Sequence, residues 1–300
     1  MFCPRWLGLN YYTFELQINN KIGTLKEVFS NICKPFMPLI TLTSDYGISD
    51  PYVAALKGRI YAESQTVPVV DISHQLTFSN FIEAAYVLGN TYAHFPKKTV
   101  HVVAFNELGG SGKLLAAELD GHYFLLADNG LLGLINPEMK INKVIEIDLK
   151  QAHSLFPSRD ILLPAALHLL RGGNIDLLGL PFDKWLKRSL GVAKVNEDKN
   201  QITGEICYID NNGNVVTNIS KKMFVALAHG RKFEIKLPRN RQITELKLNY
   251  NQVPNGSVLA LFNSMEMLEL AVNGSESKAV NGISSLLGLS VKNQIDIHFK

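Results

Sequence analysis

From Leu39 onward, apolar runs with the pattern of strands alternate with stretches that have the period of helices. The run at residues 39–43 is rich in β-branched side chains and leads into a loop, after which Asp50 is a capping candidate and Pro51 fits a first helical position. Strands are predicted at 39–43, 67–72, 99–105, 114–119 and 123–127, and helices at 51–57, 80–92 and 164–170. This alternation predicts an α/β fold with a mostly parallel sheet flanked by helices on both faces.

The pattern changes after about residue 190, where a polar stretch at 192–202 has the composition of a linker. Beyond it, short apolar runs are separated by turns, and Asn212-Gly213 between two such runs is a strong hairpin signal. Strands are predicted at 204–209, 214–219, 232–237, 257–262, 268–272 and 296–299. With little helical pattern in this part, we expect an all-β barrel-like domain.

These patterns divide the chain into an N-terminal α/β domain at 37–192 and a C-terminal β domain at 200–300. Residues 1–36 lack the basic start, long apolar centre and small-residue cleavage site of a signal peptide. We expect them to be an extension outside the fold or the product of a misplaced start codon. A short amphipathic segment packed on the surface is the alternative.

The composition excludes several functional classes. Hydrophobic residues make up 46% and charged residues 19% of the chain, as in a soluble globular protein. Basic residues form no cluster or stripe, so we expect no nucleic-acid partner. Cys3, Cys33 and Cys207 are widely spaced, which indicates neither a disulfide framework nor a metal site and fits the reducing cytoplasm. No apolar run is long enough to cross a membrane.

The segment Gly109–Lys113 superficially resembles a phosphate-binding P-loop. That motif requires glycine five residues before its Gly-Lys pair and serine or threonine after the lysine. Glu107 and Leu114 occupy these positions, and the following residues have the pattern of a strand, not of a helix whose N-terminus could hold phosphate. We therefore do not expect a nucleoside-triphosphate site.

Several polar residues lie where strands are predicted to end, the usual place for ligands in α/β sheets. Asp45 can accept the two hydroxyls of a ribose or stabilise its own loop. Asp50 can bind a ligand ammonium or cap the next helix, and Asp210 can bind an ammonium or fix an Asx turn. Asn214 and Ser264 can contact a purine edge, although an asparagine in a hairpin is often structural.

Together these residues belong to an ordered series of motifs. The series comprises residues 43–47 with 50–53, 70–74, 127–132, 158–160, 208–215, and 263–264 with 268–273. In content and order it resembles the S-adenosylmethionine (SAM) hydroxide adenosyltransferases, or SAM hydrolases, a family that also includes the SAM-dependent fluorinase and chlorinase. The resemblance runs from about residue 38 to the C-terminus.

The resemblance implies a homotrimer whose SAM sites lie between the N-terminal domain of one subunit and the C-terminal domain of the next. By motif position, Asp45 would hold the ribose, Asp50 and Asp210 the methionine part, and Asn214 and Ser264 the adenine. SAM is then a substrate or ligand, and neither a further cofactor nor a metal is expected. The family reaction is an in-line displacement at the ribose C5′. Because the sulfonium leaves as a neutral thioether, the protein need only supply a positioned, poorly solvated nucleophile.

The sequence departs from the family at the residues that activate water. Where hydrolytic members carry Asp, Arg and His, this chain has Asn106, Lys113 and Pro157. Neither Asn106 nor Pro157 can act as a base, and a lysine lacks the planar fork of an arginine. Glu107, beside Asn106, and His153, four residues before Pro157, are the candidates for a replacement.

Ser158 supports a different nucleophile, because the fluorinase has a serine at the matching position that helps to hold the halide. The segment 105–110 does not resemble that of the halogenases, however, and Glu107 would repel an anion if it faced the pocket. Three interpretations remain: a SAM hydrolase in which Asn106, Lys113 and Ser158 line the reacting centre, a noncatalytic SAM- or adenosine-binding protein, and a transferase that uses a nucleophile other than water.

Overall fold

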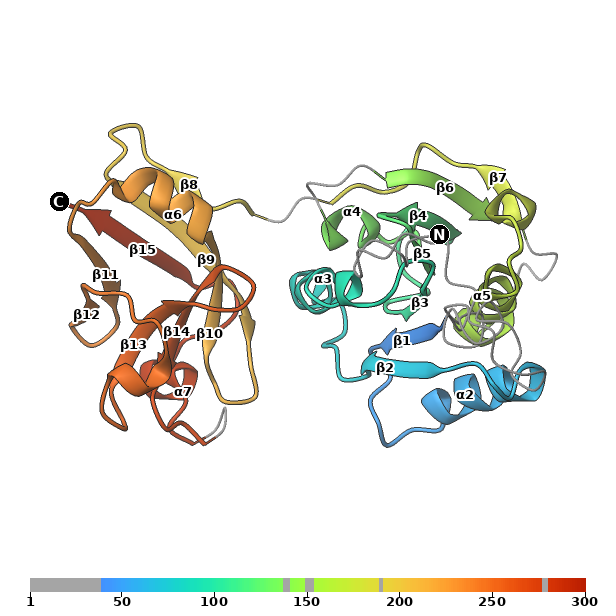
Figure 1. Ribbon diagram of the computed structural model, residues 1–300, viewed down its shortest axis with the longest axis horizontal. Helices are drawn as coiled ribbons and strands as arrows, with labels where there is room; N and C mark the ends of the chain where they lie inside the picture. The colour runs from blue at the N-terminus through green and yellow to red at the C-terminus, as the bar shows by residue number, and fades with distance from the viewer. Residues whose placement is uncertain (1–38, 137–140, 149–153, 189–190, 277–279) are drawn as a thin grey trace, which may run out of the picture.

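The computed structural model describes residues 39–136, 141–148, 154–188, 191–276 and 280–300. The chain forms two lobes, each built on its own sheet (Figure 1). The predicted extension at 1–36 and the candidate base His153 both lie outside the described residues.

The N-terminal lobe contains a seven-stranded sheet in the order β2-β1-β3-β5-β4-β6-β7. Its strands are β1 (Ile40–Ser44), β2 (Val69–Ser73), β3 (Val100–Ala104), β4 (Leu114–Leu119), β5 (His122–Ala127), β6 (Ile141–Ile147) and β7 (Gly179–Pro181). Neighbours from β2 to β5 run parallel, whereas β4, β6 and β7 pair antiparallel. The predicted α/β class is confirmed, but the sheet is mixed. Strands β4 and β5 pair antiparallel because the turn at Asp120-Gly121, with positive φ angles of 50° and 72°, reverses the chain directly between them.

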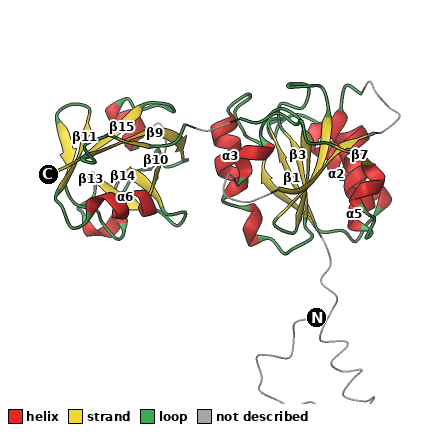
Figure 2. Ribbon diagram, turned by 90° about the horizontal axis from the view of Figure 1, so that it is seen from above, coloured by secondary structure: helices red, strands yellow, loops and turns green. Residues whose placement is uncertain are grey.

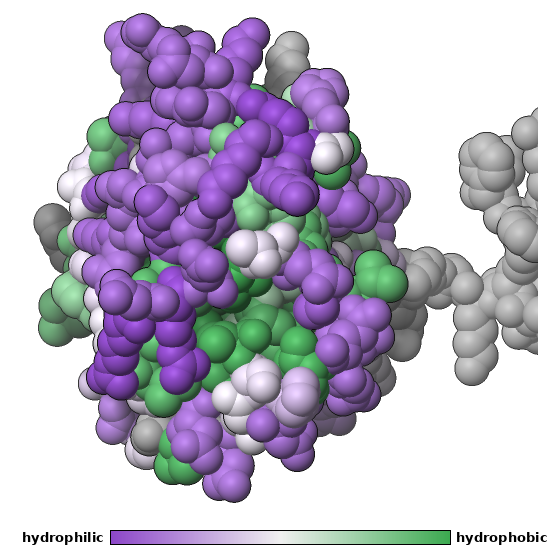
Figure 3. Space-filling model, turned by 90° about the vertical axis from the view of Figure 1, so that its left-hand side faces the viewer, coloured by the Kyte–Doolittle hydropathy of each residue, from purple (hydrophilic) through white to green (hydrophobic). Residues whose placement is uncertain are grey.

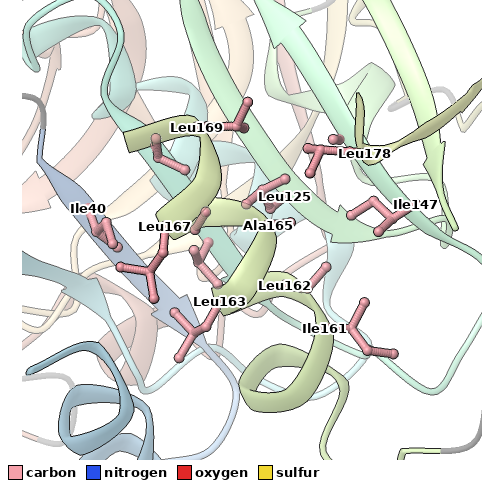
Figure 4. Packing of buried hydrophobic residues seen from close by; sticks show 14 of the residues in the cluster. Ile40, Leu125, Ile147, Ile161, Leu162, Leu163, Ala165, Leu167, Leu169 and Leu178 are labelled. Atoms are coloured by element: carbon pink, nitrogen blue, oxygen red, sulfur yellow. The ribbon is translucent and has the colours of Figure 1, made fainter. Parts of the chain in front are cut away.

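Helices cover both faces of this sheet (Figures 1 and 2). They are α2 (Tyr52–Glu63), α3 (Phe81–Gly89), α4 (Leu132–Ile135) and α5 (Leu163–Leu170), with single turns η1 (Tyr92–His94), η2 (Ser158–Leu162, a π-helical turn that leads into α5) and η3 (Ile175–Leu178). One buried cluster joins α2, η2 and α5 to the sheet, and a second joins α3 and α4 to its other face. In Figure 4, Leu163 and Leu167 of α5 lie over Ile40 of β1.

Several predicted helix boundaries differ from the structure, and the helix predicted at 51–57 continues to Glu63. The residue before α2 is Pro51, and no side chain caps this helix, so the capping role considered for Asp50 is wrong. Helix α3 ends at Gly89 instead of Tyr92, because the side chain of Asn90 donates to the Tyr86 carbonyl (2.7 Å) and a 3-10 turn follows. At its start, the side chain of Asn80 accepts the Glu83 amide (3.3 Å) as an N-cap.

The C-terminal lobe is an antiparallel, nearly closed barrel, as the sequence predicted. The strand order is β12-β11-β15-β9-β10-β14-β13, with β8 paired to β9. The strands are β8 (Lys194–Val195), β9 (Gln201–Ile209), β10 (Val215–Ser220), β11 (Phe233–Leu237), β12 (Arg241–Ile243), β13 (Val258–Phe262), β14 (Met267–Val272) and β15 (Gln294–Phe299). A bridge between Leu246, which follows β12, and Ala260 of β13 brings the two edges together.

The described part of this lobe also contains three short helical segments that the sequence pattern did not predict: α6 (Lys221–Ala228), η4 (Tyr250–Gln252) and α7 (Ile283–Leu287). The outer end of the lobe carries apolar side chains in its middle, ringed by polar ones (Figure 3). Within the described residues, no helix combines the length and the apolar character required to cross a bilayer.

The lobes of one chain meet where α3 faces β9. The rings of Tyr86 and Tyr208 stack with their centroids 4.7 Å apart, and the Asn263 side chain donates to the Tyr86 hydroxyl at 3.5 Å. Because α3 covers one face of the N-terminal sheet and α5 the other, the C-terminal lobe lies against the face opposite to η2 and α5.

Candidate functional site

Asp45 and Asn106 meet at the carboxyl ends of the parallel strands β1 and β3. Asp45 follows β1 directly, and its Oδ2 accepts the backbone N–H of Asn106, two residues after β3, at 3.0 Å. Partial burial raises the pKa of the Asp45 carboxyl, and the hydrogen bond from Asn106 acts in the opposite direction. Asp50, by contrast, is exposed in the loop before α2.

Glu107 is the centre of a hydrogen-bond cluster at the same sheet edge. Its Oε2 accepts the backbone N–H of Ser158 at 2.9 Å, and its Oε1 accepts the Tyr46 hydroxyl and lies 3.4 Å from the Ser158 Oγ. The Tyr46 hydroxyl is also 2.9 Å from the Ser158 Oγ. Ser158, the first residue of η2, is completely buried. The chain thus brings the loops after β1 and β3 together with the start of η2.

The electrostatics of this cluster are unusual because no Lys or Arg of the described residues contacts Glu107 or Asp45. Burial is the largest cause that raises the pKa of Glu107, the nearby Asp45 raises it further, and the three hydrogen bonds oppose this effect. Burial and the Glu107 charge in turn raise the pKa of Tyr46, so its hydroxyl remains a proton donor. Among the described residues, neutral donors alone therefore hold the Glu107 carboxyl group.

Three aromatic rings form an apolar wall beside the cluster. Tyr46 lies 5.3 Å from Tyr52 and 5.7 Å from Phe156, and Tyr52 and Phe156 are 5.6 Å apart, all between ring centroids. The guanidinium carbon of Arg159 lies 4.9 Å from the Phe156 ring centroid. Apolar rings next to a carboxylate lower the local polarity and so strengthen its hydrogen bonds.

Lys113 and Pro157, two of the positions that depart from the family pattern, do not join Asn106. Lys113 precedes β4 and pairs with Glu146 of β6, with its ammonium 5.0 Å from the centroid of the Phe182 ring. Pro157 is the residue before η2, with φ at −56°. Of the predicted residues, the structure brings Asn106 and Ser158 to one place, through Asp45 and Glu107, and directs Lys113 elsewhere.

The motif at 127–132 supports the loop that carries Asn106 and Glu107. The Asn129 side chain donates to the carbonyls of Phe105 (2.8 Å) and Asn106 (3.2 Å), and Asp128 accepts the Ser111 hydroxyl (2.7 Å). Gly110 adopts a positive φ of 80° and packs so closely on Asp128 that a side chain would collide with the backbone. The loop then enters β4, which confirms that a strand, not a helix, follows the P-loop-like segment.

In the C-terminal lobe, Asp210 and Asn214 are joined in one hairpin. Asp210 Oδ1 accepts the backbone N–H of Asn212 (2.9 Å) and of Asn214 (2.8 Å), and its Oδ2 accepts the Asn214 side-chain amide (3.0 Å). The Asx-turn interpretation of Asp210 is therefore confirmed. The Asn214 Oδ1 is buried and has no hydrogen-bond partner among the described residues, so it is an acceptor that can receive an N–H from a ligand.

Ser264 lies exposed in the turn between β13 and β14, next to a buried polar group that the sequence analysis did not single out. Glu269 is 5% exposed, and it accepts the Tyr250 hydroxyl (2.5 Å) and the Asn263 side-chain amide (3.1 Å). Burial is the main cause that raises its pKa. In the sequence, its position between Leu268 and Leu270 in an apolar strand indicates that the Glu269 side chain is buried.

Comparison with known proteins identifies the chain's relatives. The N-terminal domain of the SAM hydroxide adenosyltransferase family matches residues 40–179, and the C-terminal domain of the same family matches residues 204–296. The chain belongs to this family.

The relatives of this SAM hydroxide adenosyltransferase family member include hydrolases and halogenases. The chain is 28% identical to the (R)-S-adenosyl-L-methionine hydrolase of Methanocaldococcus jannaschii over 87% of its own length and 96% of that protein. It is 23% identical to the fluorinase of Actinopolyspora mzabensis, over 79% and 91%. A crystal structure of an uncharacterized conserved protein from Thermotoga maritima superposes with a TM-score of 0.76 at 25% identity, over 87% and 100%.

The N-terminal set (Asp45, Glu107, Ser158) and the C-terminal set (Asp210, Asn214, Ser264) of this family member are separate within one chain. No hydrogen bond, ion pair or ring contact between described residues joins the two sets. The C-terminal lobe packs on α3, whereas Ser158 begins the helical segment on the opposite face of the N-terminal sheet. The described residues also contain no cluster of His, Cys, Asp or Glu side chains that could hold a metal ion.

Proposed function

We propose that this protein hydrolyses SAM to adenosine and methionine by displacement at the ribose C5′. The observation that carries the proposal is Glu107, a partly buried carboxylate held beside Asp45 at the carboxyl end of β3, one residue after the position where the family's carboxylate is replaced by Asn106. Membership of a family with (R)-SAM hydrolases among its members supports the same reaction.

In the proposed reaction, the oxygen of a water molecule forms a bond to C5′ while the C5′–S bond breaks in line with it. The electron pair of that bond goes to sulfur, so the sulfonium becomes the neutral thioether of methionine. The proton that the water loses goes to Glu107, whose pKa is raised toward the range of a working base. Ser158 and Tyr46 fix the carboxylate through their hydrogen bonds.

The binding roles proposed for the remaining polar groups are those that the family resemblance implies. Asp45 receives the ribose hydroxyls at the end of β1, where α/β sheets hold such ligands. The free Asn214 Oδ1 accepts the exocyclic amine of adenine, and Ser264 contributes a hydroxyl to the same base. Asp50 and Asp210 face the methionine part, Asp210 with the acceptor capacity that its turn leaves over.

We further propose that the site is completed by a second copy of the chain in a homotrimer. The C-terminal lobe of one chain packs on α3, while the Asp45 and Ser158 set belongs to the side of the sheet that carries η2 and α5. Because the two sets do not contact each other within one chain, we infer that the C-terminal lobe of a neighbour completes the SAM site.

The test is to incubate the purified protein with SAM in water enriched in oxygen-18 and to follow the products by mass spectrometry, with a protein-free sample as control. We expect adenosine that carries the heavy oxygen on C5′, together with unlabelled methionine. Tight SAM binding without turnover would identify a noncatalytic binding protein, and a 5′-substituted adenosine would identify a different nucleophile. Either result would refute hydrolysis.

A further inference from the structure

Three proton donors converge on Glu107 from two separate segments. The Ser158 N–H and Oγ come from the start of η2, and the Tyr46 hydroxyl comes from the loop after β1. No cation among the described residues contacts this carboxylate. Converging N–H and O–H donors beside apolar rings form a binding place for an anion, and here that anion is a side chain of the chain itself.

An occupied anion position affects which nucleophiles can approach. A second anion would find the donors already engaged and would face the charges of both Glu107 and Asp45, which are close enough for Asp45 to raise the pKa of Glu107. For two like unit charges about 4 Å apart in partly polar surroundings, repulsion lowers occupancy on the order of a thousandfold. Neutral water is not repelled, and it can donate to the same carboxylate.

We propose that Glu107 determines nucleophile specificity: its carboxylate occupies the Ser158 and Tyr46 donors, so the site accepts water and excludes small anions from C5′. This inference rests on the proposed function, because it concerns the nucleophile of the same displacement. It adds that a single side chain closes a position that could otherwise hold an anionic nucleophile.

The inference predicts a new reaction when the carboxylate is removed. In Glu107→Ala the three donors become free to hold azide, whose terminal nitrogen forms a bond to C5′ as the C5′–S bond breaks and its electron pair goes to sulfur. The products are 5′-azido-5′-deoxyadenosine and methionine, and no proton is transferred. Loss of a base therefore slows the reaction with water, by about 10²- to 10⁴-fold, but not the reaction with azide.

Glu107→Gln is the matched comparison, because it removes the charge and the base but leaves a side chain of the same size on the donors. We expect it to slow hydrolysis as Glu107→Ala does and to form little azide product. Glu245→Ala is the control for the substitution itself, since the Glu245 side chain is 73% exposed in the C-terminal lobe. Glu107→Ser serves as a second small variant if Glu107→Ala does not fold.

The experiment incubates the four full-length proteins with SAM, with and without sodium azide, and measures products by mass, SAM affinity by calorimetry and folding by thermal melting. We expect Glu107→Ala to form the azide product at a rate at least tenfold above those of the unaltered protein and of Glu107→Gln. Equal azide product from the unaltered protein, or none from a folded, SAM-binding Glu107→Ala or Glu107→Ser, would overturn the inference.

The outcomes separate this inference from the proposed function. Adenosine from the unaltered protein without azide product from the small variants leaves hydrolysis standing and overturns the specificity role. Azide product from Glu107→Ala without adenosine from the unaltered protein supports the exclusion of anions by Glu107 and refutes hydrolysis. Neither product from any variant overturns both.

Discussion

Replacement of Tyr46 by phenylalanine tests the hydrogen-bond cluster without disturbing its packing. The ring stays between Tyr52 and Phe156, but Glu107 loses the hydroxyl that donates to its Oε1. Loss of a donor to a charged, partly buried group costs about 1.5–3 kcal/mol. At about 2–4 °C per kcal/mol for a domain of this size, the midpoint of thermal unfolding falls by about 3–12 °C near neutral pH.

The sign of the pH dependence follows from the charge of Glu107. The Tyr46 hydrogen bond lowers the pKa of Glu107, so the variant raises it further above the ordinary value of 4.5. The ionised Glu107 carboxylate is the form that loses the Tyr46 hydrogen bond in the variant. The loss of folding stability is therefore full at pH values above the pKa of Glu107 in the folded protein. It declines as the pH falls toward 4.5 and the carboxyl is protonated. For the same reason, the acid limb of hydrolytic activity moves to higher pH.

Thermal melting and rate measurements between pH 4 and pH 8 provide the assay, and Tyr52→Phe is the matched control. Tyr52 lies in the same aromatic group, and its hydroxyl has no hydrogen-bond partner within the described part of the chain, so its loss should change neither quantity. If Tyr46→Phe and Tyr52→Phe melt together at every pH, with identical rate profiles, then Tyr46 does not stabilise the ionised Glu107 and the electrostatic argument fails.

Two further predictions concern assembly and acid stability. Asp45→Ala and Asp210→Ala should each weaken SAM binding by about 10- to 150-fold without unfolding the protein. If the site is shared between chains, mixing the two variants should partly restore SAM binding. No recovery of binding in calorimetry, despite demonstrated subunit exchange, would exclude a shared site. Burial and the neighbouring His122 lower the pKa of His101 to about 3, so His101 is neutral in the fold and unfolding takes up a proton below pH 6.5. The contribution of His101 to stability is therefore full above pH 6.5, and stability declines below it by up to about 1.4 kcal/mol per pH unit. This decline should be shallower in His101→Gln. Identical acid denaturation of the two proteins would contradict the prediction.

Much of the fold follows from local patterns. Strand β4 matches its predicted bounds, and β1, β3 and β5 lie within one residue of theirs, because continuous apolar runs bounded by turns mark buried strands. The antiparallel part of the sheet was not predicted, although Asp120-Gly121 between two strands is a hairpin signal that favours antiparallel pairing. Helix α6 was missed because its apolar residues, Phe224 and Leu227 among them, form only two turns.

The site could be predicted in part, through motif positions, but its central residue could not. Sequence reasoning left Glu107 and His153 open as replacements for the missing carboxylate, because the direction of a side chain in a loop depends on backbone angles. Asn106 adopts a positive φ of 44°, a conformation that asparagine tolerates better than most residues, and the chain then turns so that Glu107 reaches Ser158. That contact spans 51 residues of sequence, and no local pattern encodes it.

The charge distribution of the site gives a physical reason why SAM suits it. Asp45 and Glu107 lie close together, both partly buried and without a Lys or Arg contact among the described residues, and burial raises the pKa of both. Two such carboxylates repel each other in the free protein, and a cationic ligand bound nearby reduces that cost. The sulfonium of SAM carries that charge, and the displacement removes it, because methionine leaves as a neutral thioether. In the proposed reaction the same two carboxylates therefore favour binding of the cationic substrate, and the proton that the water loses neutralises one of them.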